Sequence, residues 1–365
     1  MIWQNVRGHQ HQVEMFRRSI RRGRLAHAYL FVGDEGIGKQ TFARTLCQCL
    51  LCQRCDDAQL DACGECHACR QMQAGSHPDF LSIGRPEGKS DLPIKLIAGS
   101  PERRGREGLC FDLSLRPIAG DRRLAIIDDA DHMNAVSANA LLKTLEEPPD
   151  YSLIFLISAT AETLLPTIRS RCQLVRFSPL PSADVAYLLG KLEVVESLEE
   201  ANQLAALSGG SLAAARQLLD PQLRTLRLQL VKALADPRFD SVATTRKILE
   251  GLDELGGETQ DQRQAAVWLI RFVVDFFRLV IHQLSHGDEA AGSNEDVARF
   301  AARLEPGNAT HLELLMELIE RSAAAIEQID HKTAVPLCLE GLLDDLGRIL
   351  RRIAVQPSAV LARNT

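Results

Sequence analysis

The sequence lacks a long apolar run. Its longest candidate extends from Ala265 to Ile281 and is interrupted by Arg271, Asp275 and Arg278. A helix that crosses a membrane needs about 20 consecutive apolar residues, so we expect no membrane span. The first residues also lack the apolar centre of a signal peptide, and we therefore expect a cytoplasmic protein.

The sequence also lacks an excess of positive charge. Its formal net charge is −6, which argues against a general affinity for polyanions but does not exclude local basic patches. Hydrophobic residues make up 45% and charged residues 25% of the 365 residues, as in ordinary globular proteins. A chain of this length is long enough for two or three domains.

A third absence lies next to a glycine-rich loop. An apolar run over 28–32 predicts a strand, a helix-compatible run follows from residue 41, and residues 33–39 connect them. These residues complete the pattern G-x-x-x-x-G-K of a phosphate-binding loop, and the hydroxyl residue that should come next to hold Mg²⁺ is replaced by glutamine. The candidate ATP- or ADP-binding residues of this segment are Gly33, Gly36, Gly38, Lys39, Gln40 and Thr41.

Two further apolar runs predict strands beside this loop. The first, residues 124–127, leads into Asp128 and Asp129. The first carboxylate of such a pair holds Mg²⁺. The second is typically Glu in hydrolysing enzymes, and a misplacement near 1 Å can lower a rate about 100-fold. The second run, 153–158, ends at Ser158, and either this hydroxyl or that of Thr160 is a candidate sensor of the γ-phosphate.

Cysteine, by contrast, is abundant, and seven of the ten cysteines fall between residues 47 and 69. Disulfides are not expected in a reducing cytosol, whereas C-x-x-C spacing is typical of metal sites. We predict a module over about 47–75 that holds a structural Zn²⁺ through four thiolates and leaves no open position for catalysis. The predicted ligands are Cys52, Cys63, Cys66 and Cys69, with Cys55 as the alternative to Cys52.

Beyond residue 179 the pattern predicts helices only. Just before that point, Arg169 and Arg171 lie in a short helical segment; their chemistry alone is equally compatible with a structural salt-bridge cluster and with an arginine that reaches a neighbouring site. In the last third, one apolar stripe at helical spacing predicts a buried helix face. Its members are Leu312, Leu315, Met316, Ile319, Ala323, Ile326 and Ile329.

Several of these motifs occur in an order that resembles one family. His27-Ala-Tyr-Leu-Phe precedes the loop, the cysteine module follows it, and His77-Pro-Asp-Phe, Ala140-Leu-Leu-Lys-Thr-Leu-Glu-Glu-Pro-Pro149 and Ser170-Arg-Cys172 come next. Together they resemble the AAA+ subunits of the bacterial DNA polymerase III clamp loader, delta-prime and gamma/tau. The resemblance is close from Trp3 to about Ser178 and rests on helical layout beyond that.

The resemblance implies an α/β fold with three domains. These are an AAA+ P-loop (RecA-like) nucleotide domain over 1–178 with the zinc module inserted, a small helical lid over 179–225, and an all-α collar over 226–355 that holds a ring together. A disordered tail is expected over 356–365. The resemblance also implies a hetero-pentameric ring with gamma/tau and delta subunits that places the sliding clamp on primer–template DNA. In such a ring Arg171 is a trans-acting arginine finger for the next subunit's ATP site.

Within this family several features favour the delta-prime type. Gln40 and Asp129 replace the expected hydroxyl and Glu, and the lid motif Gly210-Ser-Leu212 is followed by Ala213 rather than by a phosphate-sensing Arg. Such a subunit would be a ring-bracing component of the polymerase holoenzyme, and itself a weak or inactive ATPase. The alternative is a gamma/tau-type ATP-hydrolysing motor, because Lys39 and the loop glycines are retained.

Overall fold

The computed structural model describes residues 2–86, 89, 91–256, 259–286, 295–330 and 333–355. The predicted tail at 356–365 lies outside the described residues. The chain forms two compact units, residues 1–205 with 210–213 and residues 206–209 with 214–365. Among the described helices, none has the length and apolarity that a bilayer crossing requires. The predicted domain boundaries at 178 and 225 remain predictions.

The first unit contains a five-stranded, fully parallel sheet in the order β2-β3-β4-β1-β5. The central strands β1, β3 and β4 are buried along their whole length, which is why each reads as a continuous apolar run. The strand bounds are β1 (Ala28–Val32), β2 (Phe80–Ile83), β3 (Arg123–Ile127), β4 (Ser152–Ser158) and β5 (Gln173–Arg176). The predicted α/β fold, with a parallel sheet that carries the glycine-rich loop, is confirmed.

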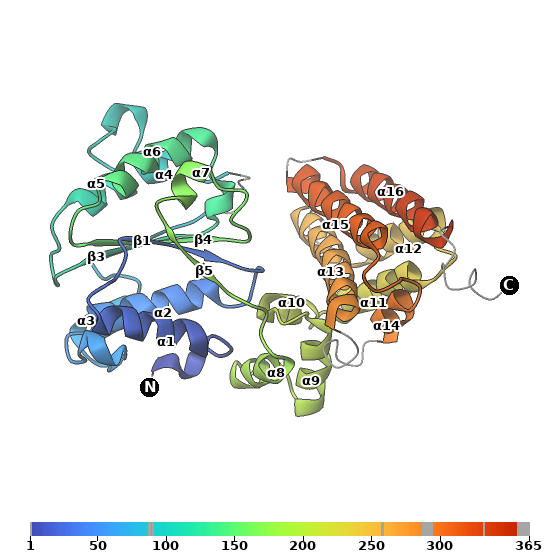
Figure 1. Ribbon diagram of the computed structural model, residues 1–365, viewed down its shortest axis with the longest axis horizontal. Coiled ribbons are helices and arrows are strands. Elements are labelled where there is room, and N and C mark those ends of the chain that lie inside the picture. Colours follow the sequence, from blue (N-terminus) through green and yellow to red (C-terminus); the bar gives the residue numbers. More distant parts are fainter. Residues whose placement is uncertain are drawn as a thin grey trace. The chain divides into compact units, whose positions relative to one another are not determined.

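Helices cover both faces of this sheet, as Figure 1 shows. One face carries α1, α2 and α3, and the other carries α4 to α7. The helices of this unit up to β5 are α1 (Gln10–Arg21), α2 (Lys39–Leu51), α3 (His67–Gln73), α4 (Ile94–Ala98), α5 (Leu109–Ser114), α6 (Ala135–Glu146) and α7 (Pro166–Arg169). Short 3₁₀ turns are η1 (Ile2–Asn5), η2 (Asp57–Gln59), η3 (Pro101–Arg103) and η4 (Ala130–His132).

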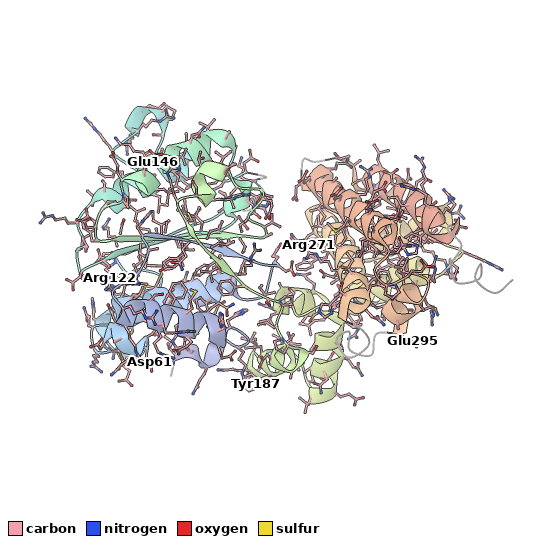
Figure 2. The ribbon with its side chains drawn as sticks, in the orientation of Figure 1. Asp61, Arg122, Glu146, Tyr187, Arg271 and Glu295 are labelled. Carbon is pink, nitrogen blue, oxygen red and sulfur yellow. The ribbon has the colours of Figure 1, made fainter. Side chains whose placement is uncertain are left out.

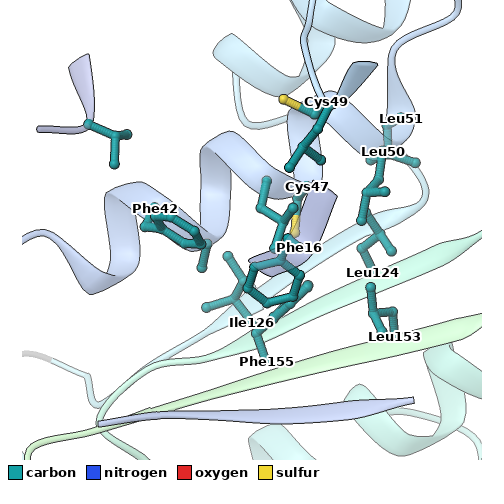
Figure 3. Close-up of a cluster of buried hydrophobic side chains, with 14 of the residues drawn as sticks. Phe16, Phe42, Cys47, Cys49, Leu50, Leu51, Leu124, Ile126, Leu153 and Phe155 are labelled. Atoms are coloured by element: carbon teal, nitrogen blue, oxygen red, sulfur yellow. The ribbon is translucent and has the colours of Figure 1, made fainter. Parts of the chain in front are cut away.

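An aromatic core fixes α1 and α2 on the sheet. Phe16 of α1 and Phe42 of α2 are fully buried, with ring centroids 5.9 Å apart, and Phe155 of β4 closes the cluster from below (Figure 3). Cys47 and Cys49 of α2 belong to the same core, as small buried cysteines commonly do. This packing holds the first turn of α2, and thus the preceding glycine loop, in place.

The motif His77-Pro-Asp-Phe has a structural role in the sheet. The carboxylate of Asp79 is completely buried and accepts hydrogen bonds from the N–H groups of Ile118, Ala119 and Gly120, at 2.7, 2.7 and 3.1 Å. It also lies 3.7 Å from Nε of Arg123, whose side chain is buried too. Asp79 thereby holds the turn that leads into β3, the strand that presents Asp128 at its other end.

The remaining elements are helical. After β5 come α8 (Ser182–Lys191), α9 (Leu198–Leu207) and α10 (Leu212–Gln217). The second unit packs the long helix α13 against α11, α14 and α15, while α16 packs against α12 and α15. Its helices are α11 (Pro221–Ala235), α12 (Ser241–Glu254), α13 (Thr259–His286), α14 (Glu295–Ala301), α15 (Ala309–Asp330) and α16 (Val335–Val355).

The predicted apolar stripe of α15 is partly wrong. Met316 is 49% exposed, whereas the polar residues His311 and Ser322 are buried. The buried face consists of His311, Leu314, Leu315, Leu318, Ser322, Ala325 and Ile329. The true face is thus rotated by about one residue from the predicted one. The buried residues that the prediction missed are His311, Leu314, Leu318, Ser322 and Ala325, because apolar residues lie on both sides of this face and two of its own members are polar.

Candidate functional site

The predicted nucleotide-binding residues meet at one edge of the sheet. The loop 33–38 follows β1, Asp128 follows β3, and Ser158 ends β4, which lies between those two strands. The register pairs Val32 with Ser158 and Ile127 with Leu156. Because all strands are parallel, their carboxyl ends share this edge, which is where open α/β sheets bind ligands.

Every carbonyl group from Gly33 to Ile37 accepts a hydrogen bond. Nζ of Lys39 donates to the carbonyls of Gly33 and Asp34, at 2.5 and 2.6 Å. The next three carbonyls are bonded by Ser211 Oγ at 2.9 Å, by the Leu212 N–H at 3.0 Å, and by His9 Nε2 at 2.7 Å. Because these carbonyl groups are engaged by hydrogen-bond donors of the protein, the loop can offer its backbone N–H groups to an anion, as a phosphate-binding loop requires.

None of these three partners was predicted from the sequence as a contact of the loop. His9 is 1% exposed and packs edge-on against Phe177, so a pattern of exposed polar residues would not have found it. Ser211 was noted only as part of the lid motif, since its contact with Glu35 joins residues 176 positions apart. Both connect distant segments to the loop backbone.

The loop glycines fit this close approach. Gly36 has φ of +76°, and a Cβ placed on it would lie 2.4 Å from the Cβ of Ala213. The backbone of segment 210–213 therefore lies directly on the loop, where there is no room for a side chain at position 36. Gly38, with φ of +96°, precedes α2 and lets the helix begin in a conformation that other residues adopt only with strain.

Lys39 is buried and lies near several partly buried carboxylates. Burial lowers the pKa of Lys39, while the negative charges of Asp128 and Asp131 act in the opposite direction. Burial and the neighbouring Asp129 carboxylate raise the pKa of Asp128 to about 6. Asp131, which the sequence reasoning did not single out, accepts a hydrogen bond from the Ala159 N–H at 3.0 Å and so joins the end of β4 to this cluster.

The residues expected to act on Mg²⁺ and water differ in their exposure and contacts. Gln40 and Thr41 are exposed at the start of α2. Asp129 has a left-handed φ of +51°, and its carboxylate lies 3.5 Å from Nε of Arg85. The hydroxyl of Ser158 donates to the Thr160 carbonyl. In the part of the chain that the structure describes, the Ser158 hydroxyl and the Asp129 carboxylate are thus each engaged by another group of the protein.

A second site is formed by four cysteines that the structure brings together. The sulfurs of Cys52, Cys63, Cys66 and Cys69 all lie within 4.8 Å of one another, and this group does not include Cys55. Three of the S–S distances are 3.7, 4.0 and 4.0 Å. Four thiolates at about 2.3 Å from a tetrahedral Zn²⁺ would be roughly 3.8 Å apart, so the cluster fits that ion.

Backbone N–H groups further favour thiolates in this cluster. Cys63, Cys66 and Cys69 donate their N–H groups to the sulfurs of Cys52, Cys63 and Cys66, at 3.5, 3.3 and 3.4 Å. Burial alone raises the pKa of the Cys52 thiol, but hydrogen bonds from the backbone of Cys63, Arg54 and Cys55 lower it to about 6. A thiolate is the form that binds a metal.

The module that carries these cysteines holds the N-terminal segment. Trp3 Nε1 donates to the Leu60 carbonyl at 2.7 Å, and the Ile2 N–H donates to Asp61 at 3.2 Å. Arg21 of α1 donates to the Ala58 carbonyl at 3.2 Å. These contacts therefore attach the N-terminal segment and α1 to residues 58–61 of the module, between Cys52 and Cys63.

Arg171 lies on the opposite face of the sheet. It follows α7, and its Nη2 makes an ion pair with Oε1 of Glu146 at 2.6 Å. Its side chain is 33% exposed. Both alternatives considered for this arginine thus keep support, because it takes part in a salt bridge and is also accessible.

The part of the chain that carries these two sites is similar in sequence to known proteins. Residues 8–181 match the family model described as DNA polymerase III, delta subunit. The chain is 38% identical over 217 residues to DNA polymerase III subunit delta' of Pseudomonas aeruginosa, covering 58% of this chain and 62% of that protein. It is 34% identical to the delta' subunit of Escherichia coli K12, over 60% of this chain and 61% of that protein. The chain is similar to delta-prime subunits.

This delta-prime similarity does not extend over whole proteins, since the chain spans about six-tenths of the length of those two relatives. It is also 28% identical to DNA polymerase III subunit tau of Escherichia coli K12, over 70% of this chain and 38% of that protein. Among solved structures, a gamma-subunit-related protein of Thermotoga maritima aligns over 93% of this chain and 100% of that chain, with 18% identity and a TM-score of 0.35.

Proposed function

We propose that the protein is a delta-prime-like subunit of the DNA polymerase III clamp loader and acts in DNA replication. The observation that carries this proposal is the contrast between an accessible arginine and an incomplete nucleotide site. Arg171 is accessible at the surface, whereas the protein's own phosphate loop lacks a hydroxyl after Lys39 and has Asp129 engaged by Arg85. A subunit of this kind completes a neighbour's ATP site better than its own.

In this role the protein works inside a ring in the cytoplasm. Its partners are the gamma/tau and delta subunits, and it meets the sliding clamp and primer–template DNA through the complex. The delta-prime similarity supports these partners. The residues 1–178, 179–225 and 226–355 would form the nucleotide domain, the lid and the collar.

The cysteine cluster holds Zn²⁺ in a structural role. The tetrahedral spacing of the sulfurs and the N–H groups aimed at them support this assignment. The four protein ligands fill the coordination shell, so the ion has no position for water or substrate.

The phosphate loop binds ATP or ADP without efficient hydrolysis. Gly33, Gly36, Gly38 and Lys39 cradle the phosphates, and the contacts of Ser211 and Leu212 keep the lid segment on the loop. Since these contacts involve backbone carbonyls, they do not depend on a nucleotide phosphate. The nucleotide would therefore be a static component.

Assembly tests the clamp-loader role. We expect the purified protein to form a single five-subunit complex with gamma/tau and delta subunits, detected by size-exclusion chromatography with light scattering. The complex should load a sliding clamp onto primed DNA, and omission of this protein should abolish loading. A protein that stays separate from those subunits, while they assemble with an authentic delta-prime, would refute the proposal.

The second candidate function is a gamma/tau-type ATPase, which the intact Lys39 contacts favour. We expect the isolated protein to bind ATP and not to turn it over, and Lys39→Ala to weaken nucleotide binding by at least about tenfold, since a charge-assisted contact contributes roughly 1.5–3 kcal/mol. Calorimetry measures the nucleotide binding, and phosphate release measures the hydrolysis.

Robust ATP hydrolysis by the wild-type chain, lost in Lys39→Ala, would instead establish a gamma/tau-type ATPase. A gain of hydrolysis in Gln40→Thr would identify Gln40 as the block.

A further inference from the structure

Glu146 occupies an unusual position in the first unit. It is the last residue of α6 and is followed by Glu147 and two prolines. The carbonyl end of a helix is its negative pole, where acidic side chains are disfavoured and basic ones preferred. Helix stability therefore does not account for two glutamates at this end. Figure 2 shows Glu146 on the face of the sheet that carries α6 and α7.

The Glu146 carboxylate binds one nitrogen of the Arg171 guanidinium, and two other groups bind a second nitrogen. Its Oε1 accepts from Nη2 at 2.6 Å, while Nη1 donates to the Thr167 carbonyl at 2.9 Å and lies 3.3 Å from Ser170 Oγ. A guanidinium has five N–H donors in a planar fork. These contacts fix the plane of the fork from two directions and still leave donors for a further anion.

Contacts other than the ion pair also hold α7. Ile168 of that helix is completely buried, and the N–H of Arg171 donates to the Ile168 carbonyl at 3.0 Å. The pair itself is exposed, with side-chain exposures of 33% and 49% for Arg171 and Glu146. Exposed pairs contribute little to folding stability, so the consequence of this contact is the orientation of Arg171.

We propose that Glu146 is a positioning residue for Arg171. It holds the guanidinium in the orientation in which its remaining N–H groups meet the γ-phosphate of the nucleotide on a neighbouring subunit. This inference rests on the proposed function, in which Arg171 acts in a ring. Glu146 does not itself touch the nucleotide, and all its effect on the reaction passes through Arg171.

The test is a double-mutant cycle in a reconstituted clamp loader, with DNA-stimulated ATP hydrolysis as the readout. Glu146→Gln should lower kcat at the neighbouring site about two- to fivefold, the range expected for an exposed ion pair, with little change in KM for ATP. Glu147→Gln is the matched control, because it removes the same charge one residue away, and it should leave kcat unchanged. The unfolding midpoint of both variants should equal that of the wild type.

The decisive arm is Glu146→Gln in the background of Arg171→Ala. If Glu146 acts only through Arg171, the second substitution has no further effect there. An unchanged or raised kcat in Glu146→Gln, or an equal loss in both backgrounds, would overturn the assignment of Glu146. If Arg171→Ala alone leaves the ATPase undiminished, the finger itself fails, which separates the failure of the proposed function from that of Glu146.

Discussion

Replacing Cys66 with serine is expected to release the proposed Zn²⁺ and to lower the free energy of unfolding of the first unit by more than about 4 kcal/mol. Loss of a structural metal belongs to the few single changes with effects of this size, because metal binding and folding are coupled. Serine can still cap α3 as Cys66 does, since it is a favoured N-cap residue. The loss would therefore report the metal and not the helix cap.

Metal analysis of the purified variants measures the first effect, and urea unfolding measures the second. The matched control is Cys55→Ser, which lies near the cluster but outside the group of four. It should retain the metal and change stability by less than about 0.5 kcal/mol. Loss of the metal from Cys55→Ser together with its retention in Cys52→Ser would show that the first ligand is Cys55.

The fluorescence of Trp3 offers a local probe of metal loss from the cysteine cluster. The sequence has two tryptophans, and Trp3 donates to the Leu60 carbonyl inside the cysteine module, whereas Trp268 is buried in the second unit. Chelation should shift the emission of Trp3 to the red as its contacts open. A Trp3→Phe variant should lose that shift while it keeps the same metal content.

The central strands were predictable because burial on both faces leaves an unbroken apolar run. This holds for β1, β3 and β4, whose every residue is buried. The edge strands β2 and β5 gave no such signal, since only one residue of each is buried. Their pairing is fixed by neighbours in space: Asp79 holds the turn before β3, and β5 aligns on β1.

The site was predictable where its chemistry is contiguous in the chain. The loop 33–39 and the C-x-x-C steps could be read directly, because short spacing places their groups together. The contacts that hold the loop could not be, since His9 and Ser211 reach it from 28 and 176 positions away. The ion pair of Arg171 with Glu146, 25 positions apart, likewise depends on the packing of α6 against α7.

Substitution of Arg171 by alanine is expected to have the largest functional effect. Arginine fingers stabilise the charge that develops on the transferring phosphoryl group and raise kcat about 10³- to 10⁵-fold. In a reconstituted loader, Arg171→Ala should therefore lower hydrolysis at the neighbouring site by at least about 1,000-fold. The total DNA-stimulated rate would fall by the share of that site, without loss of ring assembly.

Two further substitutions separate this role from a loss of charge. Arg169→Ala removes a positive charge from the exposed end of the same helix α7 and should leave the rate nearly unchanged. Arg171→Lys keeps the charge but loses the planar fork, so it should restore only a small part of the activity. Equal losses in Arg169→Ala and Arg171→Ala would mean that only the local positive potential matters. An undiminished rate in Arg171→Ala would show that Arg171 is not an arginine finger and that its role is the structural salt bridge with Glu146.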